Sequence, residues 1–347
     1  MRFHQIELLM TRKATAADVA RDAGVSAATV DRVLNNRGGV GEDKERRVLE
    51  AARRLKLDRA LDLRAARTLR VAVFLQPGTN PFHASLAAAF RAQNHGPNPF
   101  NLQSRIHHAD PRDATSTLKA LRKASASHEA LITCLPDTPS IAAFLEARAA
   151  SGQPVITLAS DVGAPHAIYI GPDNYRAGRI AGELTGRFLG RHGGKVLVMA
   201  GHLSMIGQTE RCEGIRDALA EHYPRAQLLD IVEMGDGVER AAHFLHAALR
   251  AEPDIAAIYC ASAAVKEIAQ ALALHSRGAA RPVVIAHELT PERRRLLAEG
   301  IIDALIDQEP AVEVETALRQ IAIIFGRSEP GGLEMETPLR IYLREHL

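Results

Sequence analysis

The chain has 347 residues, 46% of them hydrophobic and 24% charged, and a formal net charge of +2. This length predicts two or three domains with buried cores, and the composition excludes disordered and collagen-like chains. No apolar segment approaches the ~20 residues that span a bilayer, and the first ten residues lack the apolar centre of a secretion signal. The 3 cysteines are widely separated. We therefore expect a cytoplasmic protein without a disulfide framework, a metal site or a membrane partner.

Positive charge is concentrated near the N-terminus. Residues 1–70 contain 16 Lys and Arg against 10 Asp and Glu, a net charge of +6, whereas the remainder of the chain carries −4. A basic head on a mildly acidic body predicts an anionic partner for the head alone. Alternatively, the same net charge of +6 could belong to a basic surface that contacts only solvent.

Three short helices are predicted in the N-terminal part of the chain. Gly24 has the character of a helix terminator, and Ser26 has N-cap chemistry for the helix that follows. The helices cover about residues 16–23, 26–34 and 42–56, and their apolar positions predict a small core of Val19, Ala20, Val25, Val30, Val33 and Leu34.

From residue 70 onward, apolar runs alternate with helical stretches. Continuous apolar runs are typical of parallel strands that are buried on both faces, so the alternation predicts a doubly wound α/β body. About 275 residues are too many for one such domain, which favours two Rossmann-like lobes. Strands are expected at 70–75, 130–135, 154–158, 195–200, 255–260, 282–286 and 303–307, with weaker ones near 101–107, 168–171 and 228–233; helices are expected at 84–93, 139–151, 175–191 and 238–251.

The spaced string T-x-x-D-V-A-x-x-A-G-V-S-x-x-T-V-x-R-V-L-N-N, which begins at Thr15, is the most specific signal in the chain. It predicts a helix-turn-helix, in which the second helix enters the DNA major groove. Ser26, Thr29 and Asn35 have small hydrogen-bonding groups suited to phosphate contacts, and Arg32 is long enough to reach guanine O6 and N7. The alternative is a three-helix cap with an ordinary polar surface.

This string resembles the N-terminal signature of the lactose-repressor (LacI/GalR) family of bacterial transcription regulators, and the rest of the chain resembles a type I periplasmic sugar-binding protein. The resemblance implies that Thr15, Ser26, Thr29 and Asn35 contact phosphates and that Ala27, Ala28 and Arg32 read bases. Asp31 stands where the family has Ser, so a phosphate contact is lost there. Because Ala27 and Ala28 offer only methyl groups, Arg32 must provide most of the hydrogen-bonded readout.

The resemblance implies a ligand-responsive transcription regulator, a repressor, which binds a pseudo-palindromic operator as a homodimer and senses a small sugar or polyol. The expected domains are a DNA-binding domain at 1–57, a hinge at 58–69, and an effector-binding and dimerisation domain at 70–347. Its lobe 1 would comprise about 70–172 and 309–335, and its lobe 2 about 173–308 and 336–347. Two other classes of protein with the same body fold remain as alternatives. One is a solute receptor for transport, which has no use for the helix-turn-helix, and the other is an enzyme that acts on a sugar.

The expected hinge departs from the family pattern, because Arg59-Ala60 replace Pro-Asn and Ala66 occupies the position of the wedge leucine. Leu61 or Leu63 would act as a displaced wedge in the minor groove, with Arg64 and Arg67 beside it. A plain helical linker is an equally good interpretation.

Polar side chains follow several predicted strands, where ligands bind in open α/β sheets. Carboxylates, amides, a guanidinium and an aromatic ring suit a sugar, although each polar group alone, Asp173 and Ser262 above all, could instead be a solvated group or a helix cap. Ala159 and Ser160 replace a charged pair of the family, and the excess of carboxylates favours a neutral ligand over a sugar phosphate. The candidate effector residues are Asn80, Phe82, Asp161, Asp173, Arg211, Asp236, Ser262, Glu288 and Gln308.

Catalytic motifs are not found. The GRHGGK segment at 190–195 lacks phosphate-loop spacing, and neither a dinucleotide fingerprint nor a nucleophile elbow occurs. We therefore expect no enzyme activity and no cofactor.

The hinge interpretation predicts that Leu61→Ala or Leu63→Ala lowers operator affinity and DNA bending and leaves effector affinity unchanged, because a wedge acts only on the DNA. Circular-permutation gel shifts measure the bending. Unchanged bending in both variants would favour the plain linker.

Overall fold

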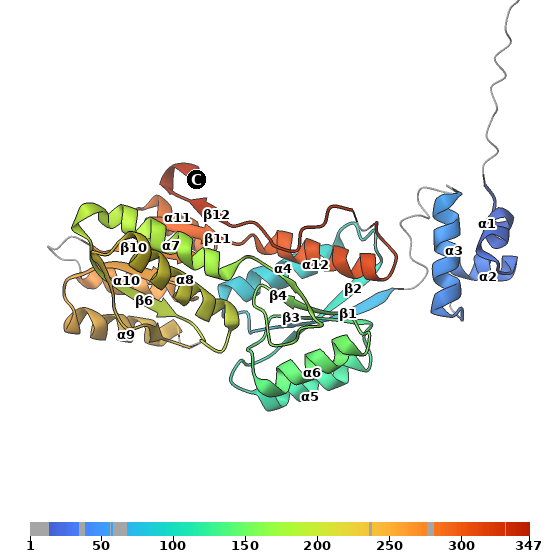
Figure 1. Cartoon of the computed structure of the whole chain (residues 1–347), viewed down its shortest axis with the longest axis horizontal. Coiled ribbons are helices and arrows are strands. Elements are labelled where there is room, and N and C mark those ends of the chain that lie inside the picture. The colour runs from blue at the N-terminus through green and yellow to red at the C-terminus, as the bar shows by residue number, and fades with distance from the viewer. Residues whose placement is uncertain are drawn as a thin grey trace, which may run out of the picture.

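The computed structural model describes residues 14–34, 39–55, 57, 68–235, 238–275, 281–329 and 331–347. Within these residues, no helix combines the length and the apolar character needed to cross a membrane. The elements divide into a helical head and an α/β body, as the sequence predicts (Figure 1).

The head consists of α1 (Ala16–Ala23), α2 (Ala27–Leu34) and α3 (Glu42–Arg54). Thr15 and Asp18 form a capping box at the start of α1, and Gly24 ends it in the left-handed conformation with φ 61°. Ser26 caps α2 as predicted, because its hydroxyl accepts from the backbone N–H of Thr29 at 3.1 Å. The turn is also held by α3, whose Arg47 donates to the carbonyl oxygens at the end of α1.

The three helices share one small core. It contains the buried residues Val19, Ala20, Ala23, Val30, Val33, Val48, Ala51 and Ala52, with Val25 and Leu34 packed partly buried against it. The head therefore has a core of its own, to which all three helices contribute.

Lobe 1 is a five-stranded parallel sheet in the order β2-β1-β3-β4-β5. Helices α4 and α12 cover one face through Leu86, Phe90 and Val314, and α5 and α6 cover the other. The elements are β1 (Leu69–Leu75), α4 (Pro81–His95), β2 (Leu102–His108), α5 (Ala114–Ser125), β3 (Ala130–Thr133), α6 (Pro139–Ala150), β4 (Val155–Leu158), β5 (Ile168–Ile170) and α12 (Pro310–Ile324).

Lobe 2 is a larger sheet in the order β12-β11-β10-β9-β6-β7, with β8 also paired to β6. Helices α7 and α8 cover one face, and α9, α10 and α11 cover the other. The elements are α7 (Asn174–Leu189), β6 (Gly194–Ala200), α8 (Ile206–His222), β7 (Ala226–Leu228), β8 (Val232–Glu233), α9 (Val238–Ala251), β9 (Ile255–Cys260), α10 (Val265–His275), β10 (Val283–His287), α11 (Pro291–Ala298), β11 (Ala304–Asp307) and β12 (Arg340–Tyr342), with short 3-10 helices at Gly190–His192 and Arg344–His346.

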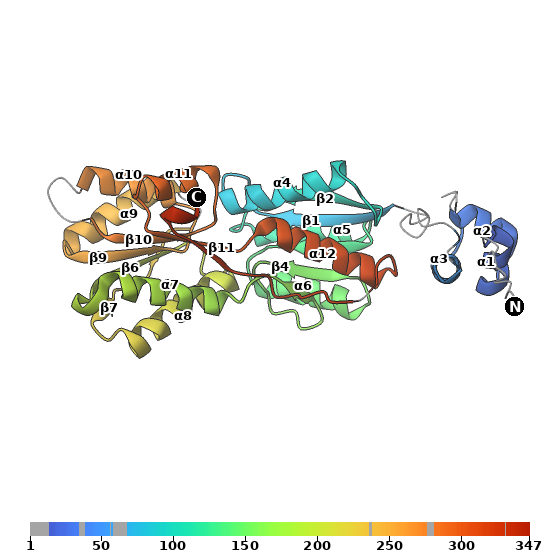
Figure 2. The same ribbon diagram turned by 90° about the horizontal axis from the view of Figure 1, so that it is seen from above.

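The chain crosses between the lobes three times: after β5, after β11 and after α12 (Figure 2). The first and third crossing segments pair with each other through Gly171, whose backbone bonds Met335 and Thr337. Two details differ from the sequence prediction. The expected strand near 228–233 is split into β7 and β8, and β12 runs antiparallel to β11 because the third crossing returns it to the sheet edge from lobe 1.

Helices α7 and α8 approach each other closely because glycines line their contact. A Cβ added at Gly178 would lie 2.1 Å from the carbonyl oxygen of Arg211, and one at Gly214 would lie 2.1 Å from the carbonyl oxygen of Tyr175. Both obstacles are backbone atoms, which cannot turn away as a side chain would. The glycines therefore set the position of α8, the helix that carries Arg211.

We predict that Gly178→Ala lowers the free energy of unfolding by about 1–3 kcal/mol. The overpacking outweighs the gain of up to ~1 kcal/mol in helix propensity. Urea denaturation measures the change. The control is Gly331→Ala, where nothing lies within 4 Å of the added Cβ. Equal stability of the two variants would contradict the close-packing argument.

Candidate functional site

The exposed side chains of α2 lie where the helix-turn-helix prediction requires them. Ser26, Ala27, Ala28 and Arg32 are exposed, while Val30 and Val33 face the core of the head. The Ser26 and Thr29 hydroxyls lie 2.9 Å apart at the start of the helix. The Thr15 side chain is engaged in its capping box. Asn35 and the hinge residues Leu61, Leu63, Arg64 and Arg67 lie outside the described residues.

A cavity of about 380 Å³ lies between the lobes of the body. Its walls come from loops at the carboxyl ends of strands in both sheets, which is the position expected for a ligand in this fold. The lining residues include Gln76, Asn80, Phe82 and His83 from lobe 1, and His202, Met205, Arg211, Ser262, Glu288 and Gln308 from lobe 2.

Six of the nine predicted effector residues line this cavity: Asn80, Phe82, Arg211, Ser262, Glu288 and Gln308. Asp161 and Asp173 do not. Asp161 instead accepts from the Thr157 hydroxyl and the Val162 N–H, and Asp173 caps α7 by accepting from the Arg176 N–H. Asp236 lies outside the described residues.

Arg211 is the centre of a buried network on the cavity wall. Its side chain is 4% exposed, its Nε donates to the Asn174 side-chain oxygen at 2.9 Å, and its Nη2 donates to the Gln308 side-chain oxygen at 3.0 Å. Asn174 also donates to the carbonyl oxygen of Ala159 in lobe 1. The guanidinium is therefore held by residues at the first and second crossings between the lobes.

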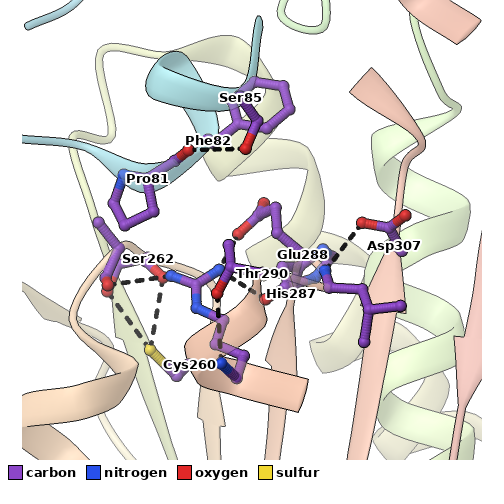
Figure 3. A network of polar contacts seen from close by, with 12 residues as sticks. Pro81, Phe82, Ser85, Cys260, Ser262, His287, Glu288, Thr290 and Asp307 are labelled. Atoms are coloured by element: carbon purple, nitrogen blue, oxygen red, sulfur yellow. Dashed lines mark hydrogen bonds and ion pairs between the residues drawn. The ribbon is translucent and has the colours of Figure 1, made fainter. Parts of the chain in front are cut away.

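Glu288, the predicted carboxylate of the site, is paired with a cation. Arg293 of α11, 3% exposed, donates to the Glu288 carboxylate and to the carbonyl oxygens of His287 and Ala263. The second Glu288 oxygen accepts from Gln308 at 3.2 Å. In Figure 3, Ser262 and Glu288 lie opposite Pro81 and Phe82 of α4. Both carboxylate oxygens of Glu288 are thus engaged within the protein.

Two buried titratable groups lie in the same region. The Tyr259 hydroxyl is 2.6 Å from Nε2 of His287, and burial, with the charges of Arg211 and Arg293, holds the pKa of His287 well below its usual value. Burial raises the pKa of Glu313 well above its usual value, against the opposing effect of Arg211. For both side chains, burial therefore favours the uncharged form.

A loop of lobe 2 reaches into lobe 1 beside the cavity. Met205 belongs to the loop before α8, yet its side chain packs in the lobe 1 core, and Gln76 of lobe 1 donates to its sulfur at 3.6 Å. The Gly207 N–H donates to the Ser160 hydroxyl, and the Asp137 N–H donates to the Ser204 carbonyl oxygen. These contacts join the lobes directly.

The predicted effector residues do not include Asn174, Arg293 or Met205. Asn174 follows the same strand end as the predicted Asp173, so its position in the sequence marks it as a candidate. Arg293 lies inside a helix and Met205 in a loop, where no pattern in the sequence marks them as neighbours of the cavity.

Because Arg293 neutralises a buried carboxylate, Arg293→Met should lower the free energy of unfolding by about 3–5 kcal/mol, the usual effect of removing one partner of a buried ion pair. Chemical denaturation measures it. Arg294→Met, at an exposed position on the same helix, is the matched control. A loss below ~1 kcal/mol would contradict the pairing.

Two family models match the chain. The model described as periplasmic binding protein domain matches residues 71–326, and the model of bacterial regulatory proteins, lacI family, matches residues 15–57. The two matches coincide with the α/β body and the helical head.

Curated relatives are regulators. The HTH-type transcriptional regulator DegA of Bacillus subtilis is 26% identical over 60% of this chain and 61% of its own length. The regulator RegA of Clostridium saccharobutylicum is 40% identical over 20% of this chain and 22% of its own length. The matches therefore span less than two thirds of these relatives.

Solved structures share the body fold. A Caulobacter myo-inositol binding protein is 18% identical with a TM-score of 0.71, covering 81% of this chain and 95% of its own. The glucose-galactose binding protein GanP of Geobacillus stearothermophilus is 23% identical with a TM-score of 0.67, covering 81% and 99%. The chain therefore belongs to the periplasmic binding protein domain family through its two-lobed body, and its helix-turn-helix head matches the lacI family of bacterial regulatory proteins.

Proposed function

We propose that the protein is a ligand-responsive transcription regulator that binds operator DNA through its head and a small polyhydroxylated effector in the cavity between its lobes. The observation that carries this proposal is the presence, in one chain, of a helix-turn-helix with exposed reading residues and an interlobe cavity lined by buried polar groups. Such a protein works in the cytoplasm, where the operator is, and needs no enzyme activity.

A homodimer is part of this proposal. One head offers too few contacts for useful affinity, so two heads on a pseudo-palindromic operator are required. Residues 58–69 would serve as the hinge, and residues 70–347 as the effector-binding and dimerisation domain. Effector binding would change the angle between the lobes, and through the hinge it would change the spacing of the paired heads.

A solute receptor for transport is the second candidate, because the solved relatives with this body fold include a myo-inositol binding protein and a glucose-galactose binding protein. The head argues against it: a receptor has no use for a capped helix-turn-helix with its own core.

We predict that Arg32→Ala weakens binding to the operator by about 1–3 kcal/mol and weakens binding to random DNA much less, because Arg32 is the only long donor at the reading positions of α2. Gel-shift titration against both DNAs measures the difference. The matched control is Arg21→Ala, at an exposed position on α1.

If Arg32→Ala reduces binding to operator and random DNA equally, its side chain contacts only the backbone. If the wild-type protein discriminates no DNA sequence at all, the regulator proposal itself fails.

A further inference from the structure

The guanidinium of Arg211 is a buried cation that makes no ion pair within the described part of the chain. Its two hydrogen bonds go to the neutral amides of Asn174 and Gln308. Nη1 has no hydrogen-bond partner among the described residues, and the side chain lines the cavity. A buried charge is costly unless it is paired, so this arrangement leaves a place for an anion.

The nearby carboxyl groups of the described residues do not fill that place. Glu288 is paired with Arg293 and also accepts from Gln308. Asp307 accepts from the N–H of Leu289 and does not line the cavity. Glu313 is fully buried, both of its oxygens lack hydrogen-bond partners among the described residues, and burial raises the pKa of its carboxyl. Glu313 does not line the cavity, and no ion pair or hydrogen bond joins it to Arg211 within the described part of the chain.

Among its described residues, the same cavity offers few free charged acceptors to a neutral polyol. Hydroxyl groups need acceptors, and carboxylates are the strongest. The Glu288 oxygens are engaged, Asp161 does not line the cavity, and Ala159 and Ser160 supply no charge. Asp110 lies at the cavity in an ion pair with Arg112, which lowers its pKa to about 2.

We propose that the effector carries a carboxylate, which binds Arg211 at Nη1, as in a sugar acid or another polyhydroxylated acid. The inference rests on the proposed function and replaces the expectation of a neutral ligand. That expectation counted Asp161, Asp236 and Glu288 as free charges, and Asp236 lies outside the described residues. One unpaired guanidinium matches a single negative charge, so a carboxylate suits the site better than a dianionic phosphate. The cavity volume of about 380 Å³ is in the range of small-molecule sites.

The test uses the full-length protein and pairs of probes in which a carboxylate replaces one hydroxymethyl group. Gluconate is compared with glucitol, glucuronate with glucose, and galacturonate with galactose, first by thermal shift and then by calorimetry. Glucose 6-phosphate is the probe that tests binding of a doubly charged phosphate. A charged hydrogen bond in place of a neutral one should make the carboxylate of a pair bind roughly 5- to 15-fold more tightly than its neutral partner.

Arg211→Gln keeps a side chain that can hydrogen-bond to the neighbouring amides and removes the charge. It should abolish the preference for the carboxylate within a pair, whereas Arg211→Lys should keep part of it. Arg216→Gln, which removes an exposed charge from the same helix, is the matched control and should bind like the wild type. The comparison of probes on the wild-type protein does not depend on whether a variant folds.

Three results would overturn the inference: neutral probes that bind as tightly as their carboxylates, glucose 6-phosphate as the tightest ligand, or no binding of any carboxylate. Gel shifts with the same preparation test the proposed function separately. If a neutral effector releases the operator, the proposed regulator function stands and the carboxylate inference fails. If the protein binds a carboxylate but discriminates no DNA sequence, the carboxylate inference stands and the proposed regulator function fails.

Discussion

The position of the Arg211 guanidinium is the constraint on which the geometry of the body depends. It bonds Asn174 at the first crossing between the lobes and Gln308 at the second, so it links two of the three segments about which the lobes can turn. A ligand that binds Arg211 acts on both segments at once. The backbone beneath it is equally restricted, because Gly178 of α7 leaves no space for a Cβ against the Arg211 carbonyl.

This arrangement connects occupancy of the cavity to the angle between the lobes. The loop before α8 inserts Met205 into the core of lobe 1, and Gly207 bonds Ser160 across the interface. Well-packed contacts of this kind shift between discrete arrangements and do not deform continuously. In the proposed regulator, a displacement of α8 would therefore favour one arrangement of the lobes over another.

The head obeys a different constraint. Its reading surface is set by local features, namely the Thr15 capping box, the left-handed Gly24 and the Arg47 side chain that bonds the end of α1. None of these features involves the body. The head can therefore keep its shape while the body changes.

The sequence by itself determined the features that depend on local chemistry. Caps, turn glycines and apolar runs predicted α1 and α2, the buried parallel strands and the strand ends that carry Asn80, Glu288 and Gln308, whereas Arg211 lies inside α8. Tertiary structure decided how those groups are paired. Arg293 becomes the counter-ion of Glu288 only because α11 folds back over the end of β10, and Asp173 becomes a helix cap and not a cavity residue. A charge pattern read along the chain counts carboxylates, but whether each one is free depends on partners that are distant in sequence, and only folding brings those partners together.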